Sequence, residues 1–179
     1  KDIFVDIFAQ KKSSKYDPSR TLGISKSNID YFNNEIVDIK KILWEIKNIK
    51  IYTEKDSKKE LLKFNNENKQ IFSIIRNYQL QKLLIKKLKS SKLTRFKNNP
   101  NIDKSKYKLV INCDKTHLYT KKFFSKTIEK KYNSYAYTTT IVHTKLDNNT
   151  AFQNFTNNGP IAFLPISDIK TSIVYSLRS

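Results

Sequence analysis

The chain is almost without glycine, cysteine and histidine, and it contains no methionine. Of its 179 residues, two are glycine (Gly23 and Gly159), one is cysteine and two are histidine. Two isolated glycines cannot form a complete G-x-G-x-x-G or Walker phosphate loop within these residues. One cysteine excludes a disulfide framework, and together with only two histidines it does not favour a Cys/His zinc site.

Acidic side chains are also scarce, which makes the chain strongly basic. Lysine and arginine number 35 against 16 aspartates and glutamates, so the formal net charge is +19. Only four of the 35 are arginine, and residues 144–179 carry a net charge of just +1. A positive charge of this size favours polyanionic partners or anionic surfaces. The hydrophobic content of 38% is sufficient for a packed core, so the composition is not that of a disordered tail.

Long apolar runs are missing as well. No segment approaches the roughly 18 apolar residues of a membrane-spanning helix. Residues 1–8 alternate in polarity and are too short and too acidic for a signal peptide. Because the chain lacks an initiating methionine and both ends run into strand-like residues, we expect a piece of a longer protein.

Periodicity predicts a mixed α/β fold. Alternating or short apolar runs predict strands at residues 4–9, 48–53, 60–64, 71–75, 93–96 and 108–112. Three-and-four spacing predicts helices at residues 25–36, 37–43 and 77–91, and residues 114–124 are expected to be a loop leading into a helix. After residue 132, four strand-like runs separated by Asn, Gly and Pro turns predict an antiparallel sheet.

Three segments carry motifs that occur together in one family. Residues 20–32 read RTLGISKSNIDYF, residues 74–84 read IIRNYQLQKLL, and residues 152–176 contain FQNFT, GPIAFLPI and SIVYS. In this order they resemble the R-[TA]-x-A-L-S segment, the I-V-[ER]-[NR]-x-x-L helix start and the final sheet motifs of the flavin-dependent aromatic-ring hydroxylases of ubiquinone biosynthesis. These 2-polyprenylphenol hydroxylases are among the para-hydroxybenzoate-hydroxylase-like flavin monooxygenases.

A fourth segment departs from the pattern of that family. The family has G-A-D-G-x-x-S-x-x-R after a strand, whereas residues 112–121 read NCDKTHLYTK. Asp114 is kept, but Asn112 and Lys115 replace the two glycines and Lys121 replaces the arginine. Because glycine permits close backbone approach and positive φ, we expect either an adapted loop or a degenerate family member.

The resemblance implies a partial Rossmann-like FAD-binding domain, residues 1–45 and 76–131, interleaved with an antiparallel β-sheet substrate domain, residues 46–75 and 132–179. It implies a monooxygenase that hydroxylates a polyprenylated phenol with FAD, O2 and NADH or NADPH, the cofactor carrying the chemistry. The expected location is the cytoplasm, with peripheral association on the inner face of the membrane. A flavin-binding glycine-rich unit would lie upstream and a further flavin motif downstream, so the isolated piece is expected to be inactive.

The resemblance also implies which residues contact the cofactor. Arg20 matches a flavin-contacting arginine, whose forked guanidinium suits phosphate; the alternative is a merely exposed arginine. Asn77 matches a nucleotide-contacting helix start, or it is simply a helix N-cap. Arg76 pairs locally or faces phosphate, and Asp114 bonds a ribose or supports its own loop. Gln10 takes the place of the strand-end acid that bonds ribose hydroxyls, or it is exposed.

On the substrate side, the resemblance singles out Gly159, Pro160 and Pro165. The corresponding stretch of the family lines the site near the flavin ring. The two prolines are expected to fix a turn and an edge beside an apolar run. The alternative to a role in the site is ordinary sheet packing. No residue is assigned a catalytic or metal-binding role.

Two other interpretations rest on charge alone. Residues 82–92 with Arg95 and Lys97 would form the phosphate-facing patch of a basic nucleic-acid-binding protein. Lysine greatly outnumbers arginine, and aromatic residues are not interleaved with this patch as stacking platforms, so we do not expect nucleic acid as a partner. The positive charge also suits peripheral docking on anionic lipid.

Overall fold

The computed structural model describes residues 2–8, 17–56, 59–65, 70–97, 102–124, 126 and 128–178. The chain forms two compact units, a smaller one of residues 1–12 and 93–132 and a larger one of residues 13–92 and 133–179. These boundaries differ from those of the two predicted domains, because the first helices and the late strands belong to the same unit. The division into a cofactor domain and a substrate domain stays a prediction.

The smaller unit is built on a parallel pair of strands. β1 (Val5–Phe8) pairs in parallel with β7 (Thr94–Lys97), the pairing that α/β nucleotide-binding folds use. The unit also contains η3 (Lys104–Lys106) and α3 (Leu118–Phe123). The strand predicted at residues 108–112 was wrong. Leu109 and Ile111 are 75% and 76% exposed, and no described strand pairs with this run.

Asp6 holds the two strands of the smaller unit together. Its carboxylate accepts a hydrogen bond from the Tyr107 hydroxyl at 2.8 Å and another from Arg95 Nε at 3.1 Å. The hydrogen bond from Tyr107 is the largest cause that lowers the pKa of Asp6, and the nearby Arg95 and Lys97 lower it further. The same bond raises the pKa of Tyr107. The charged form of Asp6 is therefore the form that the fold stabilises.

We expect the β1–β7 pair to weaken in acid. Because the folded-state pKa of Asp6 lies below its ordinary value of 3.8, its contribution is complete above that value and is lost as the pH falls through the folded pKa. Asp6→Asn should therefore speed hydrogen exchange of the β1 amides at neutral pH, with little further change in acid. Asp2→Asn, which alters an exposed carboxyl near the same strand, is the control. Unchanged protection of β1 in Asp6→Asn at neutral pH would contradict this assignment.

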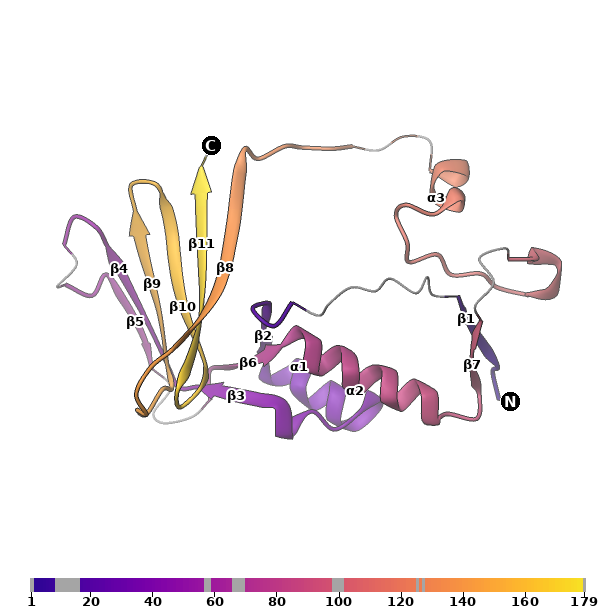
Figure 1. Cartoon of the computed structure of the whole chain (residues 1–179), viewed down its shortest axis with the longest axis horizontal. Helices are drawn as coiled ribbons and strands as arrows, with labels where there is room; N and C mark the ends of the chain where they lie inside the picture. Colours follow the sequence, from indigo (N-terminus) through magenta and orange to yellow (C-terminus); the bar gives the residue numbers. More distant parts are fainter. Residues whose placement is uncertain are drawn as a thin grey trace. The chain divides into compact units, whose positions relative to one another are not determined.

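The larger unit contains two sheets (Figure 1). The six-stranded sheet has the order β5-β4-β9-β10-β11-β8, and the three-stranded sheet has the order β2-β6-β3. The bounds of the six strands are β4 (Asn48–Thr53), β5 (Leu62–Asn65), β8 (Ser134–Val142), β9 (Thr150–Thr156), β10 (Gly159–Ser167) and β11 (Lys170–Arg178). The bounds of the three strands are β2 (Thr21–Ser25), β3 (Leu43–Ile46) and β6 (Phe72–Arg76).

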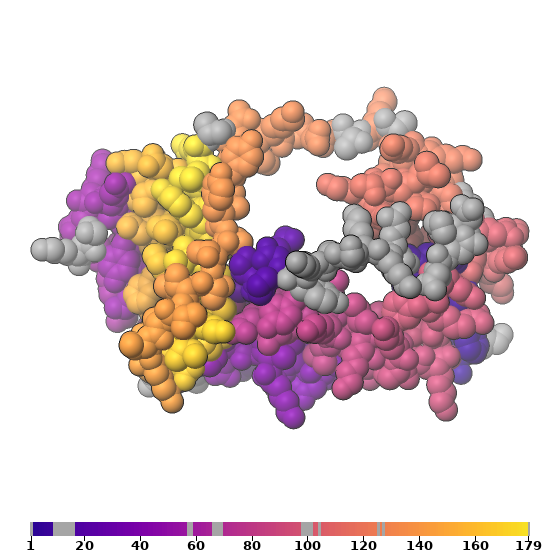
Figure 2. Space-filling model, viewed as in Figure 1, coloured from indigo at the N-terminus to yellow at the C-terminus, as the bar shows by residue number. Residues whose placement is uncertain are grey.

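The antiparallel sheet predicted after residue 132 is confirmed. β8 pairs with β11, β11 with β10 and β10 with β9, all antiparallel, and Figure 2 shows β8 to β11 packed together beside β4 and β5. The parallel pairing of β4 with β9 was not predicted. The helix predicted at residues 37–43 was wrong, because only η2 (Lys40–Ile42) is helical there and β3 begins at Leu43.

Two helices cover the three-stranded sheet. α1 (Lys26–Tyr31) continues as the π-helix η1 (Phe32–Ile36), and Ser25 caps α1 by accepting a hydrogen bond from the Asn28 amide at 3.3 Å. α2 (Asn77–Ser90) matches the predicted helix. A cluster of buried and half-buried side chains joins both helices to the sheet: Ile24, Ile29, Ile39, Leu80 and Leu83. No described helix has both the length and the apolar character to cross a membrane.

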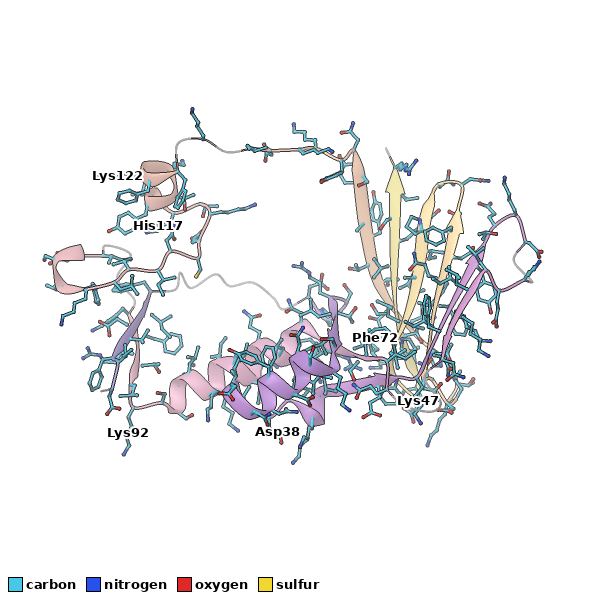
Figure 3. The ribbon with its side chains drawn as sticks, turned by 180° about the vertical axis from the view of Figure 1, so that it is seen from behind. Asp38, Lys47, Phe72, Lys92, His117 and Lys122 are labelled. Carbon is cyan, nitrogen blue, oxygen red and sulfur yellow. The ribbon has the colours of Figure 1, made fainter. Side chains whose placement is uncertain are left out.

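A second core cluster joins the two sheets and defines two faces of the six-stranded sheet. Ala151 of β9 and Leu164 of β10 pack with Ile46 of β3, and Figure 3 marks Lys47 and Phe72 near this junction. We call the face that carries Ala151 and Leu164 the inner face. Side chains alternate along a strand, so Phe152 and Phe163, which are paired in register, lie on the opposite face, the outer face.

Candidate functional site

Arg20 and Asn77 meet where β2 and β6 come together. Thr21 pairs with Arg76 in the antiparallel register, and one step further the Asn77 amide donates a hydrogen bond to the Arg20 carbonyl at 3.0 Å. The Arg20 side chain is exposed. Two predicted residues that are distant in the sequence are thus joined through their backbones at the start of α2.

The start of α2 has no side-chain cap. Arg76 occupies the N-cap position in an extended conformation, so Asn77 is the first helical residue and not the cap. The first amides of a helix lack intrahelical acceptors, and the helix dipole places partial positive charge there. Arg76 Nη1 donates to the Tyr78 hydroxyl at 3.5 Å, which is local pairing. With Lys41 and Gln79, Arg76 also lines a hollow of about 150 Å³.

Small hydroxyl groups fix the chain that leads into β2. Ser172 of β11 lies on the inner face of the six-stranded sheet, and its hydroxyl donates to the Ser19 carbonyl at 3.3 Å. Thr21 donates to the Ser172 hydroxyl at 3.5 Å, and the hydroxyls of Ser19 and Thr138 lie 2.9 Å apart. The backbone on both sides of Arg20 is therefore anchored to the inner face of the sheet.

Asp114 supports its own loop in the smaller unit. Its Oδ1 accepts hydrogen bonds from the Thr116 amide and from the Thr116 hydroxyl, both at 2.8 Å. Its carbonyl accepts from the His117 amide at 3.1 Å and from the Thr120 hydroxyl at 2.8 Å. This turn leads into α3, where Figure 3 marks His117 and Lys122.

The loop around Asp114 does not need glycine at the positions of Asn112 and Lys115. Asn133 is the only non-glycine residue with positive φ in the described part of the chain, so neither Asn112 nor Lys115 needs the conformation that glycine would supply. A ribose contact by Asp114 stays a prediction, as does its convergence with Arg20 and Asn77, which belong to the other unit. Gln10 lies outside the described residues.

The predicted substrate-side residues all lie on β10. Gly159 begins the strand with φ of 134°, and Pro160 follows it. Pro165 is fully buried beside the irregularity in register between Pro165 and Ser167. The prediction of an edge strand was wrong, because β10 lies between β9 and β11. The prolines are tolerated because they occupy the strand start and a bulge, where a missing N–H costs little pairing.

An open cavity of about 530 Å³ lies on the outer face of the six-stranded sheet. Tyr52, Phe152, Phe163 and Pro165 form its apolar wall, and the polar side chains of His143, Asn148, Asn154 and Thr171 also line it. Of the predicted site residues, only Pro165 lines this cavity. The spacing of Phe152 and Asn154, two residues apart on one face of β9, was the one sequence signal for it, and that signal does not say which face is open.

Comparisons with known proteins identify the fold. No family model matches the chain, and a search of curated proteins found no match. Solved structures do match. PqsL, a probable FAD-dependent monooxygenase from Pseudomonas aeruginosa, superposes with a TM-score of 0.67 at 10% identity, over 97% of this chain and 53% of that one.

Two further structures of PqsL give the same result. PqsL in complex with 2-aminobenzoylacetate has a TM-score of 0.69 at 10% identity, and a variant with four substitutions has 0.69 at 11%. Both matches cover 97% of this chain and 54% of the other. The chain therefore spans about half the length of these structures. It has a mixed α/β fold of the flavin-monooxygenase type, which confirms the fold class predicted from the sequence.

Proposed function

We propose that this chain is part of a flavin-dependent monooxygenase that hydroxylates an aromatic ring. The observation that carries the proposal is the match of 97% of the chain to a probable FAD-dependent monooxygenase. The motifs at residues 20–32, 74–84 and 152–176 support the same proposal from the sequence. They favour a polyprenylated phenol of ubiquinone biosynthesis as the substrate, NADH or NADPH as the reductant, and peripheral association with a membrane.

The residues around the start of α2 fit the phosphate groups of FAD. An exposed arginine whose backbone bonds a helix N-terminus without a side-chain cap would provide a cation, a favourable dipole and donor amides in one place. Arg20 would hold the pyrophosphate through its forked donors, and the Asn77 side-chain amide would donate to the nucleotide. The Asn77 main-chain amide keeps Arg20 in position by bonding its carbonyl.

Bound FAD would supply the redox chemistry with O2 that no side chain of this chain provides. The chain's own part would be to bind and orient the cofactor and to shield the reacting ring from water. The inner face of the six-stranded sheet lies next to Arg20 through Ser172 and Ser19, so its side chains are the ones that would border the reacting ring.

The test uses the full-length protein that carries this chain. We expect it to purify with the visible absorbance of bound flavin and to oxidise NADH or NADPH faster when a phenolic substrate is present. Mass spectrometry should then find the substrate heavier by one oxygen atom. A full-length protein that takes up no flavin when incubated with FAD, or that forms no hydroxylated product from the phenols supplied, would overturn the proposal.

A further inference from the structure

We propose that the cavity on the outer face binds a small, neutral aromatic molecule that donates a hydrogen bond, at a site separate from the one proposed for FAD. Its volume of about 530 Å³ is within the range of about 300–1,000 Å³ that is usual for small-molecule sites. The argument uses only side chains of the larger unit and does not depend on a bound flavin.

The six-stranded sheet separates the cavity from Arg20. Phe152 and Phe163, which line the cavity, alternate along their strands with Ala151 and Leu164, which pack against β3. Ser172, which contacts the Ser19 carbonyl next to Arg20, also lies on the inner face. A molecule in the cavity therefore contacts the face of the sheet opposite to the one that anchors the chain next to Arg20.

The cavity favours a neutral ligand. Among the described residues that line it, none is lysine, arginine, aspartate or glutamate, although the chain as a whole is 28% charged. An anion placed there would lose its hydration without gaining a cationic partner, whereas exposed lysines elsewhere would bind it in water. Charged ligands are therefore disfavoured at this position.

The wall of the cavity suits a planar ring. The rings of Tyr52 and Phe152 are stacked, with centroids 6.5 Å apart and planes inclined by 26°. Phe163 pairs with Phe152 in the antiparallel register, and Pro165 follows on the same strand. Aromatic side chains with this spacing favour offset stacking or edge contacts with an aromatic ligand.

The side-chain oxygen of Asn154 is why we infer that the ligand donates a hydrogen bond. Its Oδ1 is buried without a hydrogen-bond partner, an arrangement that is costly unless something pairs with it. The neighbouring polar groups already pair with one another. Asn148 Nδ2 donates to the Thr171 hydroxyl at 3.0 Å, and Thr171 Oγ1 lies 3.0 Å from His143 Nε2. A ligand O–H or N–H that reached this oxygen would supply the missing partner.

The chemistry of the ligand is tested with three probes that share a fluorinated ring. Their binding to the 179-residue chain is measured by fluorine NMR at physiological salt. They are 4-fluorophenol, which donates a hydrogen bond, 4-fluoroanisole, which cannot, and 4-fluorobenzoate, which is an anion. We expect saturable binding of 4-fluorophenol, about 5-fold tighter than that of 4-fluoroanisole because one hydrogen bond is lost. We expect binding of 4-fluorobenzoate to be weaker and to decrease with salt. Binding of 4-fluorophenol that does not saturate, or a higher affinity for 4-fluorobenzoate than for 4-fluorophenol, would overturn the proposal.

Two phenylalanines of β9 provide a matched pair of variants. Phe152 lines the cavity and is 39% exposed, whereas Phe155 is 45% exposed, does not line the cavity and lies on the inner face. We expect Phe152→Ala to weaken binding of 4-fluorophenol at least about 5-fold, since stacking area is lost, and Phe155→Ala to leave it unchanged. An equal loss in both variants would place the probe elsewhere and refute the site.

The acceptor is tested by Asn154→Leu, which keeps the side chain's approximate size. It should bring the affinities for 4-fluorophenol and 4-fluoroanisole to the same value, while folding is followed by circular dichroism. A preference for 4-fluorophenol that persists in a folded Asn154→Leu variant would contradict the role of Asn154. Since no readout involves flavin, failure here is distinguishable from failure of the proposed monooxygenase function.

Discussion

Arg20→Gln should lower the affinity of the full-length protein for FAD by about 10- to 100-fold. Hydrogen bonds to charged groups contribute about 1.5–3 kcal/mol, and each 1.4 kcal/mol is a factor of about ten in affinity. The fold should be unaffected, because the Arg20 side chain is exposed and its carbonyl still accepts the hydrogen bond from Asn77. Equilibrium titration followed by flavin fluorescence measures the change.

The control for this experiment is Arg178→Gln. Arg178 is an exposed arginine at the end of β11, so its substitution removes the same charge from a different part of the chain. If both variants lose affinity equally, the loss reflects the general positive charge of the protein and not a phosphate contact at Arg20. An Arg20→Gln variant that binds FAD as tightly as the natural protein would refute the assignment directly.

Gly159→Ala should destabilise the larger unit by about 3 kcal/mol. Gly159 has φ of 134°, a conformation that L side chains rarely adopt, and strain of this kind costs about 1–3 kcal/mol. A Cβ atom at this position would also lie 1.9 Å from the Ser176 carbonyl oxygen, so β10 would have to move away from β11. Denaturant unfolding followed by fluorescence gives the change. Trp44, the single tryptophan, belongs to this unit and bonds the Asn148 carbonyl at 2.6 Å.

Gly23→Ala is the matched control, because it makes the same substitution at the only other glycine. A Cβ atom at Gly23 would meet the Phe72 ring at 3.5 Å, which is ordinary van der Waals contact. We expect this variant to be neutral or more stable by up to about 1 kcal/mol, since alanine restricts the unfolded chain. Equal destabilisation by the two substitutions would contradict a special role for the backbone at Gly159.

Local sequence patterns predicted the helices and strands whose own residues show the spacing or the flanking turns typical of that element. α2 has leucines with three-and-four spacing at positions 80, 83, 84 and 88, and the strands after residue 132 are separated by recognisable turns, so both were found. β3 was missed because contacts with distant residues, and not its own sequence pattern, favour a strand there. Trp44 donates a hydrogen bond to the Asn148 carbonyl, and Ile46 packs against Ala151 of the other sheet. Residues 108–112 have the sequence of a buried strand, but a strand also needs a neighbour to pair with.

The candidate site could be predicted only in part for a similar reason. Motif resemblance singled out Arg20 and Asn77, but the contact between them depends on the antiparallel register of β2 and β6, which no local pattern reveals. The cavity depends on which face of β9 and β10 is covered by β3. Alternation along a strand marks two faces without saying which one is open, so Phe152 and Asn154 were not recognised.

The most direct test of the proposed function is a crystal structure of the full-length protein with FAD. The account predicts that the pyrophosphate lies within hydrogen-bond distance of the Arg20 guanidinium and of first-turn amides of α2 that follow Asn77, whose own amide bonds the Arg20 carbonyl. A pyrophosphate bound elsewhere, with Arg20 and the start of α2 in contact with solvent alone, would contradict it.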